Sequence, residues 1–158
     1  MKKQELFIGL GIVGMFTPSL CHAQQGNNAI KTTSTPNVIL IYADDLGYGD
    51  LECYGGTGAH TPNVNRLAQN GIRFTNAHAT AATSTPSRYS LLTGEYAWRK
   101  KGTDIATGNA GMIIRPERYT MADMFKNSGY ATAAVGKWHL GLGDKGGEQD
   151  WNAPLPTA

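Results

Sequence analysis

The sequence predicts an α/β fold with a mostly parallel sheet flanked by helices. Residues 37–43 form an unbroken apolar, β-branched run, which is typical of a strand buried on both faces. Residues 61–71 and 120–129 each carry the start and stop signals of a helix. The predicted order along the chain is strand, helix, strand, helix, helix, strand. This alternation favours a parallel sheet covered by helices.

Length and composition point to a folded domain without a nucleic-acid partner. The chain has 158 residues, of which 41% are hydrophobic and 16% charged, as in a globular protein with a core. The formal net charge is +2 and no basic stripe is present. After residue 23 the sequence contains a single cysteine, Cys53, so this segment carries no internal disulfide. We expect Cys53 to be a small buried apolar residue rather than a nucleophile.

The first residues resemble an export signal. Residues 1–23 have a basic start and an apolar run at 6–16 that is too short to span a bilayer. Small residues before the cut favour cleavage after Ala23, and a lipoprotein anchor on Cys21 is the alternative. We expect a secreted or periplasmic protein without a transmembrane segment. The polar residues 24–35 are predicted to be a linker.

The helix at 61–71 and the following strand are predicted from end signals and alternation. Thr61 is expected to cap the helix, Pro62 to begin it and Gly71 to end it. Residues 72–77 then alternate moderately between apolar and polar residues, which predicts a second strand.

Residues 84–94 are predicted to form a polar loop that leads into a short helix. Ser84 or Thr85 can cap the helix and Gly94 can end it in a left-handed conformation. A helix N-terminus attracts anions, and Arg88, one turn in, adds a guanidinium that matches tetrahedral oxyanions. The combination indicates nucleophilic chemistry on a sulfate or phosphate ester. The alternative is a capped surface helix whose arginine faces solvent.

The rest of the chain adds a loop, a helix and a strand. Residues 95–118 show no sustained period and are predicted to be a long surface loop, with a solvated basic cluster at 99–101. Thr120 is expected to cap a helix at 121–128, and residues 130–136 predict the last strand. The residues expected on the buried face of that helix are Met121, Met124 and Phe125.

Two polar groups follow predicted strands. Asp44 and Asp45 supply adjacent carboxylates, which favour Ca²⁺ or Mg²⁺ over Zn²⁺. The alternative for this pair is to accept hydrogen bonds from backbone amides in the loop. Lys137 and His139 lie two residues apart, so at an extended strand end they would point the same way. Lysine can hold an oxyanion, and histidine can shuttle a proton.

These groups are expected to converge with Ser84. Ligands of parallel sheets bind outside the carboxyl ends of the strands, so the three sites would meet at one edge. His60 and His78 have no such context and are predicted to be structural.

Residues 84–94 as a unit resemble the sulfatase signature, with serine where many members of the family have cysteine. Residues 36–50, 61–76 and 136–141 are similar to three further blocks of the same family, in the same order. The resemblance implies an alkaline-phosphatase-like domain. It also implies that residues 36–158 are the amino-terminal part of a truncated sulfatase catalytic domain.

The resemblance implies a metal site and a modified residue. Asp44 and Asp45 would bind Ca²⁺, with Mg²⁺ as the less favoured ion, and Ser84 would also contact the metal. Ser84 would be converted to formylglycine by a serine-type radical-SAM maturase. Arg88 would steady this residue. The two further residues implied to assist the formylglycine or the sulfate are Lys137 and His139.

The implied activity is that of a sulfuric ester hydrolase acting on a sulfated small molecule or glycan. One hydroxyl of the hydrated aldehyde would attack sulfur and expel the alcohol, and the second would then eject sulfate and restore the aldehyde. Two alternatives remain: a phosphatase or phosphonate ester hydrolase of the same superfamily, and an inactive relative that binds sulfated glycans. The family's later ligands would lie beyond Ala158, so the isolated 158 residues are expected to be inactive and only marginally folded.

Overall fold

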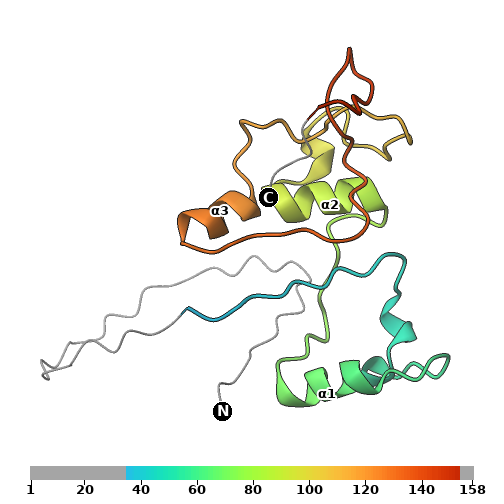
Figure 1. Ribbon diagram of the computed structural model, residues 1–158. Coiled ribbons are helices and arrows are strands. Elements are labelled where there is room, and N and C mark those ends of the chain that lie inside the picture. Colours follow the sequence, from blue (N-terminus) through green and yellow to red (C-terminus); the bar gives the residue numbers. More distant parts are fainter. Residues whose placement is uncertain (1–34, 154–158) are drawn as a thin grey trace, which may run out of the picture. The chain divides into compact units, whose positions relative to one another are not determined.

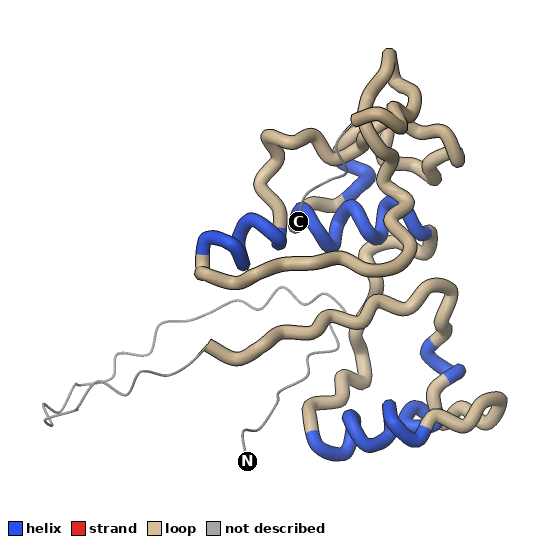
Figure 2. The backbone as a smooth tube through the Cα atoms, in the orientation of Figure 1, coloured by secondary structure: helices blue, strands red, loops and turns tan. Residues whose placement is uncertain are grey.

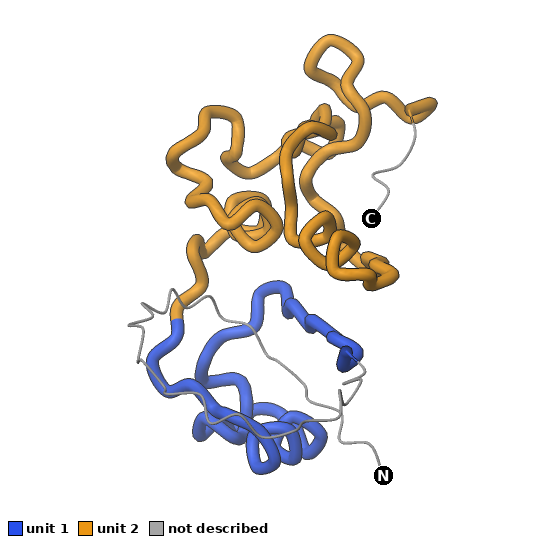
Figure 3. Tube along the Cα trace, turned by 90° about the vertical axis from the view of Figure 1, so that its left-hand side faces the viewer, with its two compact units in different colours: residues 1–77 blue, residues 78–158 orange. Residues whose placement is uncertain are grey.

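The computed structural model describes residues 35–153, so the predicted signal peptide at 1–23 and the linker up to residue 34 lie outside the described residues. The chain divides into two compact units, residues 1–77 and residues 78–158 (Figure 3). Each unit is described by itself. Within residues 35–153, none of the helices combines the length and the apolarity that crossing a bilayer requires.

The described residues form helices and loops but no β-strand (Figure 2). The strands predicted at 37–43, 72–77 and 130–136 are loop segments here, with a single bridge position at Leu40. Their large apolar side chains are exposed, for example Ile39 at 59%. An apolar run indicates that a segment tends to be buried, but it forms a β-strand only when a neighbouring strand pairs with it through backbone hydrogen bonds. The three strand predictions are therefore wrong for the described residues.

The described part of unit 1, residues 35–77, contains two short 3₁₀-helices and one α-helix. They are η1 (Tyr48–Asp50), η2 (Glu52–Tyr54) and α1 (Pro62–Asn70), and Figure 1 shows α1. The predicted helix and its first residue, Pro62, are confirmed. Thr61 is the N-cap residue and Gly71 the C-cap residue, as predicted, but the Thr61 side chain makes no capping hydrogen bond to the helix. Its hydroxyl accepts from the N–H of Glu52 at 3.1 Å.

Glu52 joins η2 to α1. Its Oε2 accepts from the Thr61 N–H and from the Asn65 side-chain amide, both at 2.7 Å. Its Oε1 contacts Nδ1 of His60 at 2.9 Å. The hydrogen bonds from His60 and Thr61 favour the carboxylate and lower the pKa of Glu52 from 4.5 to about 2. Because none of residues 35–77 is buried, this polar cluster is the main link between the two helices.

Unit 2 is built around an apolar core. It contains α2 (Ser84–Thr93), η3 (Ala97–Arg99) and α3 (Met121–Asn127), and α2 contacts both η3 and α3 (Figure 1). The core consists of Tyr89, Ala97, Ile114 and Leu140. Burial and a hydrogen bond to Glu95 raise the pKa of the Tyr89 phenol.

The ends of the two long helices of unit 2 largely follow the predicted signals. Gly94 ends α2 with φ of 70°, as predicted, but the cap residue is Thr83, so Ser84 and Thr85 lie inside the first turn. Thr120 caps α3 in a reciprocal pair with Asp123: its hydroxyl accepts from the Asp123 N–H, and the Asp123 carboxylate accepts from the Thr120 N–H. Met124 is 47% exposed, so the predicted buried face of α3 is wrong at this position.

Residues 95–118 are more than a surface loop. Ala97, Thr103 and Ile114 are buried, which corrects the prediction for this segment. The Thr103 hydroxyl contacts the carbonyl oxygens of Ala97 and Lys100, at 2.6 and 2.7 Å. The basic residues 99–101 are exposed, as predicted.

Candidate active site

Ser84 is the first residue of a well-anchored helix. On α2, Thr85, Ser87, Tyr89 and Ser90 are buried. The Ser90 hydroxyl accepts from the N–H of Ala97 at 3.2 Å, which joins the helix to η3. A helix leaves its first N–H groups without an acceptor in its own backbone, and its N-terminus carries partial positive charge. The structure therefore holds Ser84 at a position suited to an anion.

Arg88 lies against the hydroxyl of Ser84. Its Nε donates to Ser84 Oγ at 2.8 Å, and the two residues are one helical turn apart on the same face. A guanidinium at this distance stabilises negative charge on an attached or attacking oxygen. The contact fits the role expected for Arg88, and that role stays a prediction.

The segment that carries Lys137 and His139 is a turn rather than a strand end. Gly136, His139 and Gly141 have φ of 112°, 55° and 71°, all in the left-handed region. The expectation that Lys137 and His139 point the same way rests on extended backbone, which His139 does not have, and it stays a prediction. The two glycines permit the turn at low cost, whereas His139 adopts it against the usual preference of a side chain. Lys137 is exposed.

His139 is held through both its backbone and its ring. Its carbonyl oxygen accepts from the Thr85 hydroxyl at 3.0 Å. Its Nε2 lies 3.1 Å from the carbonyl oxygen of Ala106, and the N–H of Ala106 donates to the Thr85 hydroxyl at 3.0 Å. A carbonyl can only accept, so Nε2 carries a proton, and in the neutral imidazole the lone pair is then on Nδ1. Nδ1 is buried and has no hydrogen-bond partner among residues 35–153.

Asp44 and Asp45 fit a metal ion by chemistry but supply only part of a ligand set. Both are exposed, and Asp45 has φ of 56°, a conformation that aspartate tolerates in a turn. Carboxylate oxygens suit Ca²⁺ and Mg²⁺, but Ca²⁺ takes six to eight oxygens. Residues 35–153 contain no cluster of three or more His, Cys, Asp or Glu placed to hold a metal.

The structure joins some of the predicted site residues within unit 2, and others belong to unit 1. In unit 2, Ser84 contacts Arg88, and the residue after Ser84 contacts His139. Asp44 and Asp45 belong to unit 1. Their convergence with Ser84 at one edge of a sheet stays a prediction, and no sheet edge is present among the described residues.

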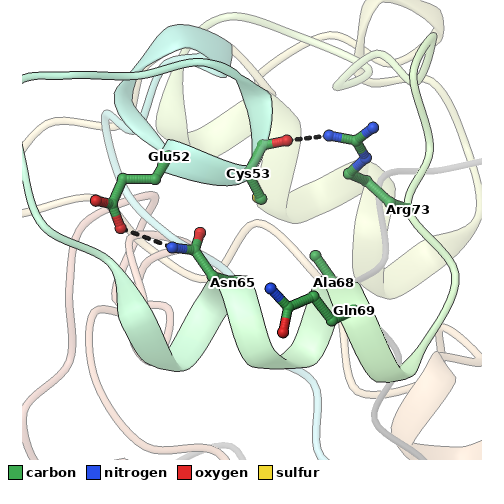
Figure 4. Close-up of a pocket in the computed structure, with 6 residues that line it drawn as sticks. All are labelled: Glu52, Cys53, Asn65, Ala68, Gln69 and Arg73. Atoms are coloured by element: carbon green, nitrogen blue, oxygen red, sulfur yellow. Dashed lines mark hydrogen bonds between the residues drawn. The ribbon is translucent and has the colours of Figure 1, made fainter.

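A hollow of about 460 Å³ lies beside α1 and contains none of the predicted site residues. Figure 4 shows its walls, which are Glu52, Cys53, Asn65, Ala68, Gln69 and Arg73. Cys53 is partly exposed here, not fully buried as predicted. Arg73 closes one side by donating to the carbonyl oxygen of Cys53. All the residues that line the hollow belong to unit 1, and none of them is on α2.

Two residues that contact His139, Thr85 and Ala106, are not singled out as site residues by the sequence. The sequence predicts Thr85 only as a possible helix cap, yet its hydroxyl bonds to the backbone of residues far along the chain. Ala106 takes part through its main-chain N–H and carbonyl, which every non-proline residue has. No side-chain pattern could have singled it out.

Ser84 and Arg88 on α2 and the turn at His139 all belong to unit 2, and comparison with known proteins shows the family of the chain. The Sulfatase family profile matches residues 36–153. The chain is 57% identical over 135 residues to an N-acetylgalactosamine-6-O-sulfatase of Bacteroides thetaiotaomicron, covering 85% of this chain and 26% of that protein. It is 44% identical over 114 residues to human arylsulfatase A, covering 70% of this chain and 22% of that protein.

The chain therefore belongs to the Sulfatase family. It also matches mouse steryl-sulfatase at 44% identity over 127 residues, which cover 76% of this chain and 20% of that protein. The matched region is between a fifth and about a quarter of the length of these relatives. Membership of the family implies an alkaline-phosphatase-like α/β fold.

Proposed function

We propose that this protein hydrolyses sulfate esters through a formylglycine derived from Ser84. The observation that carries the proposal is the contact between Arg88 and the Ser84 hydroxyl at the N-terminus of α2, inside the region matched by the family. Sulfatases generally depend on formylglycine and a metal ion, and they act on sulfated substrates. A hydrated aldehyde at this position supplies the nucleophile for sulfur and a second hydroxyl that expels sulfate.

The residues of unit 2 have separate tasks in this proposal. Arg88 orients the modified side chain of residue 84 and offsets the charge on its oxygen. His139 presents Nδ1 as an acceptor for a proton, because Nε2 is already committed to the Ala106 carbonyl. Lys137, exposed two residues before it, supplies a cation for the sulfate.

Asp44 and Asp45 would hold the metal ion. Ca²⁺ is proposed ahead of Mg²⁺, since loop carboxylates suit its flexible coordination. The bound cation would lower the energy of negative charge on oxygen during the reaction.

A sulfated sugar is proposed as the substrate, because the relative at 57% identity is named for a sulfated amino sugar. We further propose that the protein is secreted or periplasmic, and that a serine-type radical-SAM maturase converts Ser84.

The test combines mass analysis with turnover. The protein is expressed from its complete coding region in a host that has the maturase, and the peptide containing Ser84 is expected to lack two hydrogen atoms. Ser84→Ala should lower kcat for an aryl sulfate by about 10⁴-fold or more, as for the loss of other catalytic nucleophiles. Ser128→Ala, at the exposed end of α3, is the matched control and should keep full activity.

One rival activity has a specific observation in its favour. Residue 84 is a serine, and an unmodified hydroxyl beside an arginine also suits attack on a phosphate ester. Aryl sulfate and aryl phosphate are therefore compared with the same enzyme. Dominant cleavage of the phosphate by unmodified Ser84 would contradict the sulfatase proposal.

A further inference from the structure

Thr85, the residue that follows Ser84, has no role in the proposed chemistry so far. Thr85 is fully buried, with 0% of its surface exposed, although threonine is usually an exposed residue. Its hydroxyl is used twice: it donates to the His139 carbonyl and accepts from the Ala106 N–H, each at 3.0 Å. A buried hydroxyl with both capacities used connects three segments that are distant in sequence.

The three segments form a closed ring of hydrogen bonds. Thr85 binds Ala106 and the His139 backbone, and Ala106 binds the His139 ring through its carbonyl at 3.1 Å. The main chain of His139 and its imidazole are thus fixed by partners that are themselves bonded to each other. Removal of the Thr85 hydroxyl therefore leaves the His139 carbonyl and the Ala106 N–H without these hydrogen bonds.

The backbone of His139 needs such support. With φ of 55° it lies in the left-handed region, which is unfavourable for residues other than glycine by about 1 kcal/mol or more. A conformation of this kind persists only when its surroundings over-determine it. The hydrogen bond from Thr85 to the carbonyl of the same residue is one of the contacts that do so.

We propose that Thr85 is a positioning residue, which holds His139 in the tautomer that leaves Nδ1 free as an acceptor. This inference rests on the proposed function for its catalytic meaning, because His139 acts there on the group made from Ser84. Its structural content stands without that function. The ring of hydrogen bonds predicts one tautomer of the neutral His139 imidazole, with the proton on Nε2. This prediction holds whether or not the protein turns over a substrate.

The first measurement does not involve catalysis. Nitrogen-15 spectra of histidine-labelled protein report which ring nitrogen carries the proton, and the His139→Gln variant identifies the signal of His139. The wild type is expected to show His139 as the Nε2–H form. Thr85→Val keeps the shape but removes the hydroxyl, and it should give a mixture of tautomers. Thr85→Ser keeps the hydroxyl and should restore the wild-type spectrum.

Thr103→Val is the matched control. Thr103 is also buried in unit 2, at 4% exposure. Its hydroxyl also hydrogen-bonds to the backbone, at the carbonyl oxygens of Ala97 and Lys100. It has no bond to His139. Its loss should disturb packing as the loss of Thr85 does, but leave the His139 spectrum unchanged. Equal spectral changes in both variants, or an Nδ1–H form in the wild type, would overturn the proposal.

The second measurement uses turnover of aryl sulfate, normalised to the formylglycine content of each preparation because Thr85 lies within the signature. Thr85→Val should lower kcat by about 10- to 100-fold, as expected for a misplaced group, with KM changed by less than about threefold. Its pH profile for kcat/KM should also shift, and that of Thr103→Val should not. An inactive wild type with the predicted spectra would refute the proposed function and leave the role of Thr85 intact.

Discussion

Each of the two units is stabilised internally by a different kind of interaction. Unit 2 encloses an apolar core in which Tyr89 and Leu140 are each only 1% exposed. Unit 1 has no buried residue among 35–77, and its helices are joined by the hydrogen bonds of Glu52. Apolar burial is the larger and less salt-sensitive source of stability. The comparison teaches that α2, which carries Ser84, lies in the better-packed unit, and the carboxylate pair in the more open one.

The largest expected effect is on the core of unit 2. Leu140→Ala removes a fully buried side chain and leaves a cavity, so the free energy of unfolding should fall by about 2–5 kcal/mol. Urea denaturation followed by Tyr and Trp fluorescence measures this change. The same variant should loosen the turn at 136–141, because Leu140 is its anchor in the core.

The matched variant in unit 1 tests the other side of the comparison. Ile72 is 80% exposed, so Ile72→Ala should change the free energy of unfolding by less than about 0.5 kcal/mol. Similar losses at Ile72 and Leu140 would show that unit 1 has a core of its own, and would contradict the contrast between the units.

A second prediction concerns the carboxylate that organises unit 1. The pKa of Glu52 is lowered from 4.5 to about 2, so its stabilisation is complete above about pH 4.5 and is lost as the pH falls towards 2. The protection of α1 amides against hydrogen exchange, corrected for the intrinsic pH dependence of exchange, should therefore fall over that range. Glu52→Gln should exchange faster at neutral pH and lose this pH dependence.

Glu117→Gln removes the same charge from an exposed position of unit 2. It should leave the exchange of α1 unchanged at every pH. An α1 that responds equally to both substitutions would indicate an effect of net charge rather than of the Glu52 hydrogen bonds.

A smaller effect than that of Leu140→Ala is expected at the start of α3. Thr120→Ala removes the reciprocal cap with Asp123 and should destabilise unit 2 by about 1 kcal/mol. Thr120→Ser keeps the hydroxyl and should restore most of the loss. Chemical denaturation compares the two variants, and equal stabilities would show that the cap contributes nothing.

Local signals in the sequence predicted the helices but not the strands. Proline at Pro62, glycine at Gly94 and threonine at Thr120 act on the next few residues, so their effect is visible from sequence alone. A strand depends on a partner that can lie anywhere in the chain. Residues 37–43 have the composition of a buried strand, but no described neighbour completes it.

For the candidate site, side-chain chemistry was predictable and backbone contacts were not. The pairing of Ser84 with Arg88 follows from helical spacing. The turn at His139 depends on φ values that the sequence suggests only through its flanking glycines. The contacts of Thr85 join distant main-chain groups, and such groups are chemically alike along the whole chain.

The exposed apolar run in unit 1 also bears on how the chain behaves at high concentration. Residues 37–42 combine strong β-propensity with no charge and no proline, which is the pattern that favours intermolecular stacking. Pro36 precedes this run, and the negative charges of Asp44 and Asp45 follow it closely. Residues of these kinds act as gatekeepers against self-association. The carboxylate pair thus gives the chain colloidal protection, apart from any part it has in binding a metal.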